Sequence, residues 1–151
     1  SMTRQRIVVD ASVMVKWIRS EQEESLDQAN LILTDLQNEK VELYAPELAK
    51  YEVGNVLVKR KLDPNAAASS LETFYNIVVN FISETEELAK NSCAFARELN
   101  ITYYDGCYLS LAQKIDAMVI TENIKHLGKT KKVKVMPLSE YSANWNENVK
   151  S

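Results

Sequence analysis

The sequence predicts an α/β fold in which helices cover both faces of a parallel β-sheet. Short apolar runs rich in β-branched residues alternate along the chain with helical patterns of about 10–15 residues. Such alternation is typical of parallel strands that are joined by crossover helices and buried on both faces. The chain has 151 residues, of which 46% are hydrophobic. We therefore expect one domain with a sizeable core.

The first half of the chain is predicted to start with a strand at residues 6–10. Its β-branched run, Ile7, Val8 and Val9, ends at the carboxylate of Asp10. Apolar residues at three- and four-residue spacing predict the helices that follow. The elements expected after the first strand are a helix at 12–19, a helix at 25–39, a strand at 42–45 and a helix at 46–62 that starts with Pro46.

In the second half, Asp63 is predicted to cap a helix at 64–76 that has a proline in its first position. The next residues, 77–82, are rich in β-branched side chains and favour a strand over a continued helix. Ser83 and Glu86 resemble a capping box, which predicts the start of another helix. The remaining elements expected are a helix at 83–100, a helix that starts near Asp105 and ends near residue 115, a strand at 117–121 and a strand at 133–137.

The charge balance argues against a dedicated nucleic-acid-binding protein, which would usually be more basic. Lysine and arginine number 18 against 21 acidic residues, so the formal net charge is −3. If the protein handles RNA or DNA, another source of positive charge is required. No apolar run approaches the roughly 20 residues that span a bilayer, and no signal peptide is visible. We therefore expect a cytoplasmic location and no membrane partner, with Ser1 a remnant of an expression tag.

The scarcity of cysteine, histidine and glycine disfavours several kinds of site. Cys93 and Cys107 lie in apolar helical surroundings and are expected to be buried free thiols. With His126 as the only histidine, a structural zinc site or a serine–histidine–aspartate triad is disfavoured. The three glycines form neither a phosphate-binding loop nor a dinucleotide-binding motif. Function must therefore depend on carboxylates, amides and hydroxyls.

Two predicted strands end in polar side chains that can bind a ligand. The first ends at Asp10, and an apolar run further along the chain ends at Thr121, Glu122 and Asn123. In parallel α/β sheets, ligands bind beyond the carboxyl ends of the strands. A carboxylate in such a place requires a compensating partner, such as a metal ion, if it is buried. These strand ends are therefore a candidate ligand site.

Two acidic residues on predicted helices extend the same candidate site. Glu52 borders an apolar stripe, and Asp105 opens a helix. Taken singly, each has a structural alternative, since Glu52 can be an ordinary solvated side chain and Asp105 a helix cap. Taken together with Asp10, they offer hard oxygen ligands without histidine or cysteine, which suits Mg²⁺ or Mn²⁺. Such ions commonly serve phosphate chemistry.

Four segments of the sequence resemble the four motifs of the PIN domain family, in the same order and with matching spacing. They are IVVDASVMVKW, PELAKYEVGNVL, YYDGCYLSLA and VITEN, and the resemblance extends from residue 6 to about residue 139. The chain is most similar to the VapC-type toxins of toxin–antitoxin pairs. The resemblance implies a three-layer α/β/α sandwich with a five-stranded parallel sheet in the order 3-2-1-4-5. It implies a single PIN-like domain over residues 1–151, with 1–5 and 140–151 peripheral.

The resemblance also implies an activity, which is Mg²⁺- or Mn²⁺-dependent endoribonuclease cleavage that leaves a 5′-phosphate and a 3′-hydroxyl. The implied metal ligands and catalytic residues are Asp10, Glu52 and Asp105, while Ser12 and Thr121 orient carboxylates and water. The implied partners are an RNA substrate, a cognate antitoxin and a second copy of the chain. The apolar helix residues expected on the dimer surface are Leu33, Leu57 and Leu62.

The sequence departs from the family pattern at Asn123, where similar proteins usually carry an aspartate. The amide keeps an oxygen but removes a charge, which would weaken a second metal site. Neighbouring side chains on a strand alternate between faces, so Glu122 should point away if Asn123 points into the site. We therefore expect Asn123 rather than Glu122 to complete the ligand set.

Several lysine and arginine residues are candidates for contact with RNA phosphates, although each also fits an ordinary solvated position. Two other functions remain open. A PIN-like domain that binds RNA or a partner protein without cleavage is favoured by Asn123. A phosphoaspartyl receiver or phosphatase would form an acyl-phosphate on Asp10, but the absence of an aspartate at position 12 argues against the common phosphatase pattern. The candidate RNA-contacting residues are Lys16, Arg19, Lys59 and Arg60, followed by Lys129, Lys131, Lys132 and Lys134 in a later segment.

Overall fold

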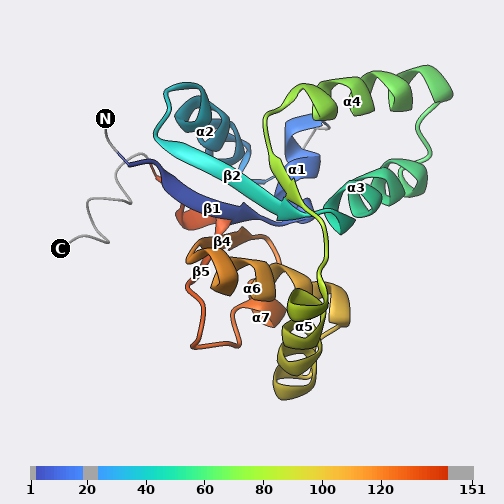
Figure 1. Cartoon of the computed structure of the whole chain (residues 1–151). Helices are drawn as coiled ribbons and strands as arrows, with labels where there is room; N and C mark the ends of the chain where they lie inside the picture. The colour runs from blue at the N-terminus through green and yellow to red at the C-terminus, as the bar shows by residue number, and fades with distance from the viewer. Residues whose placement is uncertain (1–2, 19–23, 143–151) are drawn as a thin grey trace.

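The protein folds as a five-stranded sheet that is covered by helices on both sides (Figure 1). The strands are β1 (Gln5–Val9), β2 (Val41–Pro46), β3 (Asn80–Ile82), β4 (Met118–Thr121) and β5 (Val135–Pro137). The computed structural model describes residues 3–18 and 24–142. The strands lie in the order β3-β2-β1-β4-β5, and every neighbouring pair is parallel. The predicted fold class, strand number and strand order are therefore confirmed.

Helices form the outer layers of the sandwich. They are α1 (Ala11–Ile18), α2 (Leu26–Gln37), α3 (Leu48–Lys59), α4 (Pro64–Asn76), α5 (Glu86–Leu99), α6 (Tyr103–Ile115) and α7 (Ile124–Leu127), and a 3-10 turn follows at Leu138–Glu140. Helix α1 contacts α2, α3 and α4, while α5 and α6 pack together on the other side of the sheet (Figure 1). Within the described ranges, none of these helices has the length and hydropathy needed to cross a membrane.

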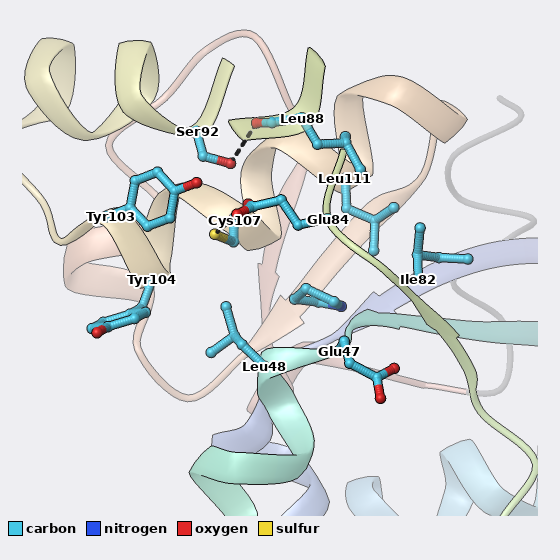
Figure 2. Close-up of a pocket in the computed structure, with 11 residues that line it drawn as sticks. Glu47, Leu48, Ile82, Glu84, Leu88, Ser92, Tyr103, Tyr104, Cys107 and Leu111 are labelled. Atoms are coloured by element: carbon cyan, nitrogen blue, oxygen red, sulfur yellow. Dashed lines mark hydrogen bonds between the residues drawn. The ribbon is translucent and has the colours of Figure 1, made fainter. Parts of the chain in front are cut away.

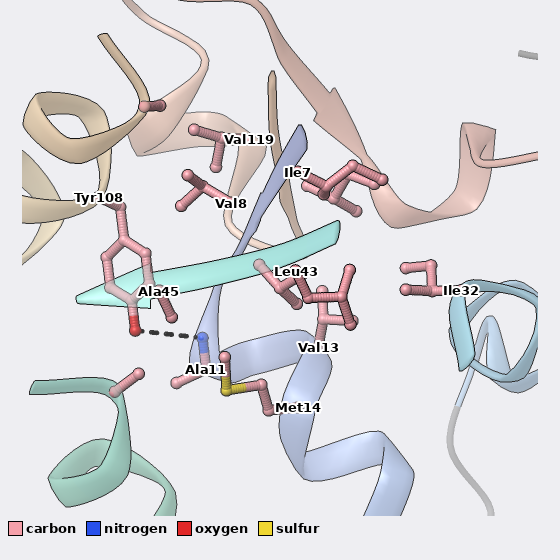
Figure 3. Packing of buried hydrophobic residues seen from close by; sticks show 14 of the residues in the cluster. Ile7, Val8, Ala11, Val13, Met14, Ile32, Leu43, Ala45, Tyr108 and Val119 are labelled. Atoms are coloured by element: carbon pink, nitrogen blue, oxygen red, sulfur yellow. Dashed lines mark hydrogen bonds between the residues drawn. The ribbon is translucent and has the colours of Figure 1, made fainter. Parts of the chain in front are cut away.

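The buried centre of the sheet consists of β1 and β4. Ile7 and Val8 of β1 and Val119 of β4 are fully buried. Side chains from both helical layers surround them, including Ile32 of α2 and Tyr108 of α6 (Figure 3). Burial of each large apolar side chain contributes about 1.5–3 kcal/mol to stability. The centre of the sheet is therefore well packed and holds the residues that follow β1 and β4 in defined positions.

Strand β3 is shorter than predicted. A strand was expected at residues 77–82, but only Asn80–Ile82 pair with β2. The preceding Val78 is 69% exposed, and β3 lies at the edge of the sheet, where it has a neighbour on one side only. The β-branched composition of this segment predicted a longer strand than the edge of the sheet supports.

Pro46 ends β2, and the prediction that it starts the next helix is wrong. It pairs with Ile82 of β3, and α3 begins two residues later at Leu48. The pairing of β2 with β1 extends only to Tyr44. A residue without an N–H group is tolerated at Pro46 because the strand no longer needs a donor on the side facing β1.

The helix caps agree with the sequence in one case and differ in another. Asp63 caps α4 as predicted, because its Oδ1 accepts a hydrogen bond from the Ala66 N–H at 2.9 Å. The capping box expected at Ser83 is wrong. Helix α5 starts later, and Thr85 caps it by accepting from the Leu88 N–H at 3.2 Å.

Three predictions about burial also need correction. Both cysteines are free thiols, but only Cys107 is buried and Cys93 is exposed. Tyr141 lies in the segment that was expected to be peripheral, yet it is 2% exposed and its hydroxyl donates to Asp35 Oδ2. Leu57 was expected on a dimer surface, but it is 2% exposed within the single chain and is unavailable to a partner.

Candidate active site

The carboxyl ends of β1 and β4 meet at Asp10. Its backbone N–H donates to the Ile120 carbonyl at 3.0 Å, which fixes the residue against the end of β4. Its side-chain Oδ2 accepts hydrogen bonds from Thr121 Oγ1 at 2.7 Å and from Ser12 Oγ at 2.8 Å. Asp10 is 8% exposed and Thr121 is fully buried. The two hydroxyls therefore hold a buried carboxylate in one orientation at the switch in strand order.

The same hydroxyls also bind the backbone that follows β4. Ser12 Oγ accepts from the Glu122 N–H at 3.1 Å, and Thr121 Oγ1 accepts from the Asn123 N–H at 2.8 Å. Glu122 is exposed and Asn123 is half-buried. Asn123 stands before α7, and its side chain makes no capping hydrogen bond there. Its side-chain amide is therefore not engaged in capping the N-terminus of α7.

Glu52 comes to the site from the middle of α3, where it is half-buried. Its Oε1 accepts a hydrogen bond from the Tyr108 hydroxyl at 2.6 Å. The Tyr108 oxygen in turn accepts from the Ala11 N–H at 3.3 Å. No role for Tyr108 was predicted from the sequence. The available signal was a buried tyrosine, whose hydroxyl usually finds a polar partner.

Asp105 lies in the first turn of α6, but it is not the cap of that helix. Thr102 is the cap, because its Oγ1 accepts from the Asp105 N–H at 3.0 Å. The Asp105 side chain is 19% exposed, and its Oδ2 is 3.9 Å from Nδ1 of His126 on α7. The structural alternative for Asp105, a capping role, therefore does not account for its carboxylate.

The three carboxylates influence one another electrostatically. Burial raises the pKa of Asp10 above its usual value, hydrogen bonds from Thr121 and Ser12 oppose the shift, and the charge of Asp105 adds to it. Burial also raises the pKa of Glu52 to about 7, and the charges of Asp10 and Asp105 contribute while the Tyr108 hydrogen bond opposes them. Bound cations relieve repulsion of this kind.

The chemistry of this donor set fits a hard divalent cation, because its members are carboxylates, hydroxyls and one amide. Over residues 3–18 and 24–142, no three acidic, histidine or cysteine side chains are already gathered closely enough to enclose an ion. Asp10, Glu52 and Asp105 therefore do not form a closed cage of ligands as they stand in the structure.

Comparison with known proteins decides the family. The family model for the PIN domain matches residues 7–132. The chain belongs to the PIN domain family. It is similar to ribonuclease VapC3 of Pyrobaculum aerophilum, with 31% identity over 121 residues that cover 77% of this chain and 88% of that protein. Membership of the PIN family argues against the phosphoaspartyl alternative.

Solved structures agree with the PIN fold. The structure of VapBC2 from Rickettsia felis bound to a DNA fragment from its promoter matches with a TM-score of 0.70 at 17% identity, covering 88% of this chain and 98% of that chain. VapC20 of Mycobacterium tuberculosis, a toxin that cleaves the sarcin–ricin loop, matches with a TM-score of 0.58 at 14% identity, covering 75% of this chain and 86% of that chain.

Some of the residues predicted to contact RNA are exposed in this PIN domain, and others are not. Lys16 is 6% exposed and its amine donates to the Glu24 carbonyl at 2.7 Å, which does not fit a surface contact with phosphate. Arg19 lies outside the described residues. Lys59 and Arg60 are exposed at the end of α3. In the later segment, Lys129 and Lys132 make contacts within the chain, to Leu99 and Glu98, and Lys131 and Lys134 are exposed.

An apolar cavity of about 150 Å³ lies beside the candidate site, between the start of α3 and the helices α5 and α6 (Figure 2). Leu48 and Tyr104 line both this cavity and a shallow hollow that contains Glu52. The Cys107 thiol in the cavity donates to Glu84 at 3.6 Å, and burial raises its pKa to about 11. The thiol is therefore protonated at neutral pH and is not an activated nucleophile.

Proposed function

We propose that this PIN domain is a divalent-metal-dependent endoribonuclease and the toxin of a toxin–antitoxin pair. One observation carries the proposal. Asp10, a buried carboxylate, is oriented by two hydroxyls at the meeting point of β1 and β4, and it lies within the electrostatic influence of Glu52 and Asp105. The similarity to ribonuclease VapC3 supports RNA as the substrate.

The residues that would hold the ion are Asp10, Glu52 and Asp105, with Asn123 rather than Glu122 as a further oxygen donor. Mg²⁺ or Mn²⁺ would supply an acidified water and neutralise charge on the scissile phosphate. A bound ion would also reduce the repulsion between the acidic residues of the site and the RNA phosphates, because it would add positive charge at the site.

The chain's own residues prepare the site for this chemistry. Ser12 and Thr121 donate to a single oxygen of Asp10, so the orientation of the carboxylate is set before any ligand binds. The burial of Asp10 excludes bulk water and strengthens its attraction for a cation. With a pKa of about 7 in the metal-free protein, Glu52 carries a proton on part of the molecules at neutral pH. Cation binding must release that proton.

The partners that we propose are an RNA substrate, a cognate antitoxin protein and a second copy of the chain. Similarity in fold to VapBC2 from Rickettsia felis and to a toxin–antitoxin complex from Klebsiella pneumoniae supports the antitoxin. Among the cations that the sequence suggested for contact with backbone phosphates, those exposed at the surface are Lys59, Arg60, Lys131 and Lys134. We propose a cytoplasmic location because the proposed substrate is RNA.

An RNase assay with the purified protein, RNA and Mn²⁺ tests the proposal, with Asp10→Asn as the matched control. We expect cleavage that leaves a 5′-phosphate and a 3′-hydroxyl, and its loss in EDTA and in Asp10→Asn. Equal cleavage by the two proteins would assign the activity to a contaminant and refute the proposal. RNA binding without cleavage at saturating Mn²⁺ would favour the alternative of a non-cleaving domain, to which the neutral Asn123 points.

A further inference from the structure

We propose that Tyr108 is a positioning residue, and that its hydroxyl fixes the Glu52 carboxylate and thereby sets the affinity of the site for its cation. The inference rests on the proposed function, because it requires Glu52 to be a metal ligand. It assigns a role to a residue that is not itself a ligand.

The Tyr108 hydroxyl connects the three segments that carry the proposed ligands. It donates to Glu52 Oε1 at 2.6 Å. It also accepts from the backbone N–H of Ala11 at 3.3 Å, as Figure 3 shows. Ala11 directly follows Asp10 in the sequence. Tyr108 itself lies on α6, three residues after Asp105 and therefore on the same side of the helix. One oxygen atom thus joins the start of α1, the middle of α3 and the first turns of α6.

Both hydrogen-bonding roles of this hydroxyl are defined by its surroundings. Ala11 is the first residue of α1, and an N–H group in the first turn of a helix has no partner within the helix. The Tyr108 side chain is 1% exposed and keeps water from that donor, so the phenol oxygen must accept from it. The single phenol proton then points to Glu52. The Ala11 N–H therefore fixes the orientation of the Tyr108 hydroxyl.

A fixed donor restricts the flexible side chain of Glu52. Tyr108 engages Oε1 of the carboxylate, which leaves Oε2 for an ion. Without the hydroxyl, Glu52 would point in several directions from its half-buried place on α3, and the ion would have to select one of them. Removal of a hydrogen-bond partner that orients a metal ligand typically lowers metal affinity or activity by about 10–100-fold.

The chain offers a close control at Tyr141. Like Tyr108, it is almost fully buried, at 2% exposed, and its hydroxyl donates to a carboxylate oxygen, Oδ2 of Asp35. This pair joins the segment after the 3-10 turn to α2 and includes none of the proposed ligands. A Tyr141→Phe substitution therefore removes a comparable buried hydrogen bond without touching the site.

Calorimetric titration with Mn²⁺ tests the proposal on the full chain in three forms, the parent protein, Tyr108→Phe and Tyr141→Phe. Urea unfolding of each metal-free form confirms that it is folded. We expect Tyr108→Phe to bind Mn²⁺ about 10–100-fold more weakly, and Tyr141→Phe to bind like the parent. RNA cleavage by Tyr108→Phe should recover when Mn²⁺ is raised to saturation, which a general loss of structure would not allow.

A second comparison asks whether Tyr108 acts through Glu52. In a Glu52→Ala background, which removes the carboxylate that accepts from Tyr108, Tyr108→Phe should cause a much smaller further loss of Mn²⁺ affinity than it causes alone, because the two residues form one unit. If Tyr108→Phe is too unstable for titration in dilute buffer, sucrose stabilises the folded state and permits the same measurement.

Two outcomes would overturn the inference while leaving the proposed function intact. One is parent-like Mn²⁺ affinity in Tyr108→Phe. The other is an equal loss of affinity in Tyr108→Phe and Tyr141→Phe, which would indicate general loosening of the core. A parent protein that neither binds Mn²⁺ nor cleaves RNA would instead refute the proposed function.

Discussion

Thr121→Val should destabilise the metal-free protein in a pH-dependent way. The substitution keeps the shape of the side chain but removes the hydroxyl that donates to Asp10 Oδ2 at 2.7 Å. A hydrogen bond to a charged group contributes about 1.5–3 kcal/mol. The Asn123 N–H also loses its acceptor, but Asn123 is only half-buried and water can replace the contact. We expect a loss of about 2–3 kcal/mol in the free energy of unfolding at pH 7.

The sign of the pH dependence follows from Asp10. Burial raises its folded-state pKa above 3.8, so ionised Asp10 destabilises the fold at pH values above the folded pKa. That effect fades as the pH falls and is absent below 3.8, where Asp10 is protonated in the folded and unfolded states. The Thr121 hydrogen bond lowers the folded pKa, so its removal enlarges the effect at neutral pH. The loss caused by Thr121→Val should therefore shrink toward pH 4.

Urea unfolding in EDTA, at pH 7 and at the lowest pH where the parent is folded, measures this loss. Ser110→Ala is the control, because Ser110 is a fully buried residue whose hydroxyl donates to a neutral backbone carbonyl, that of Leu88, at 2.9 Å. Its loss should be about 1 kcal/mol and independent of pH. Equal losses for Thr121→Val at the two pH values would refute the view that this hydroxyl stabilises an ionised Asp10.

Three further predictions concern the proposed ligands. Millimolar Mn²⁺ should raise the melting temperature by mass action, and Asp10→Asn should abolish the rise; scanning calorimetry without any shift in the parent would contradict a metal site. Asp105→Asn should lose most RNase activity while Thr102→Ala, which removes the actual cap, should lose about 1 kcal/mol of stability but little activity; an active Asp105→Asn would remove Asp105 from the site. Asn123→Asp should tighten Mn²⁺ binding, with an upper bound of about 4 kcal/mol for one added charge at ~4 Å and an effective dielectric constant of ~20. Glu122→Ala should leave the Mn²⁺ titration unchanged. Weaker binding in Glu122→Ala together with no change in Asn123→Asp would make Glu122 the ligand.

The sequence by itself determined the fold class and suggested where a candidate site lies. The alternation of short apolar strands and helices follows from local side-chain chemistry, and it predicted a parallel sheet that the structure confirms. Asp10 could be placed at the end of β1 because β-branched residues directly precede it. Asp63 could be identified as a cap because its role depends on residues only three positions away. Such features can be predicted from a sequence because each depends on residues that are only a few positions apart.

Tertiary structure decided which atoms meet. Tyr108 and Glu52 are 56 residues apart in the sequence, and Thr121 and Asp10 are 111 apart, so no local pattern indicates their hydrogen bonds. The resemblance to the PIN family named Thr121 as a residue that orients carboxylates, but it gave no role to Tyr108. Long-range contacts depend on how helices cross the sheet, and that packing is a property of the whole core. The residues of the candidate site could therefore be predicted from the sequence, while the hydrogen bonds that orient their carboxylates appear only in the tertiary structure.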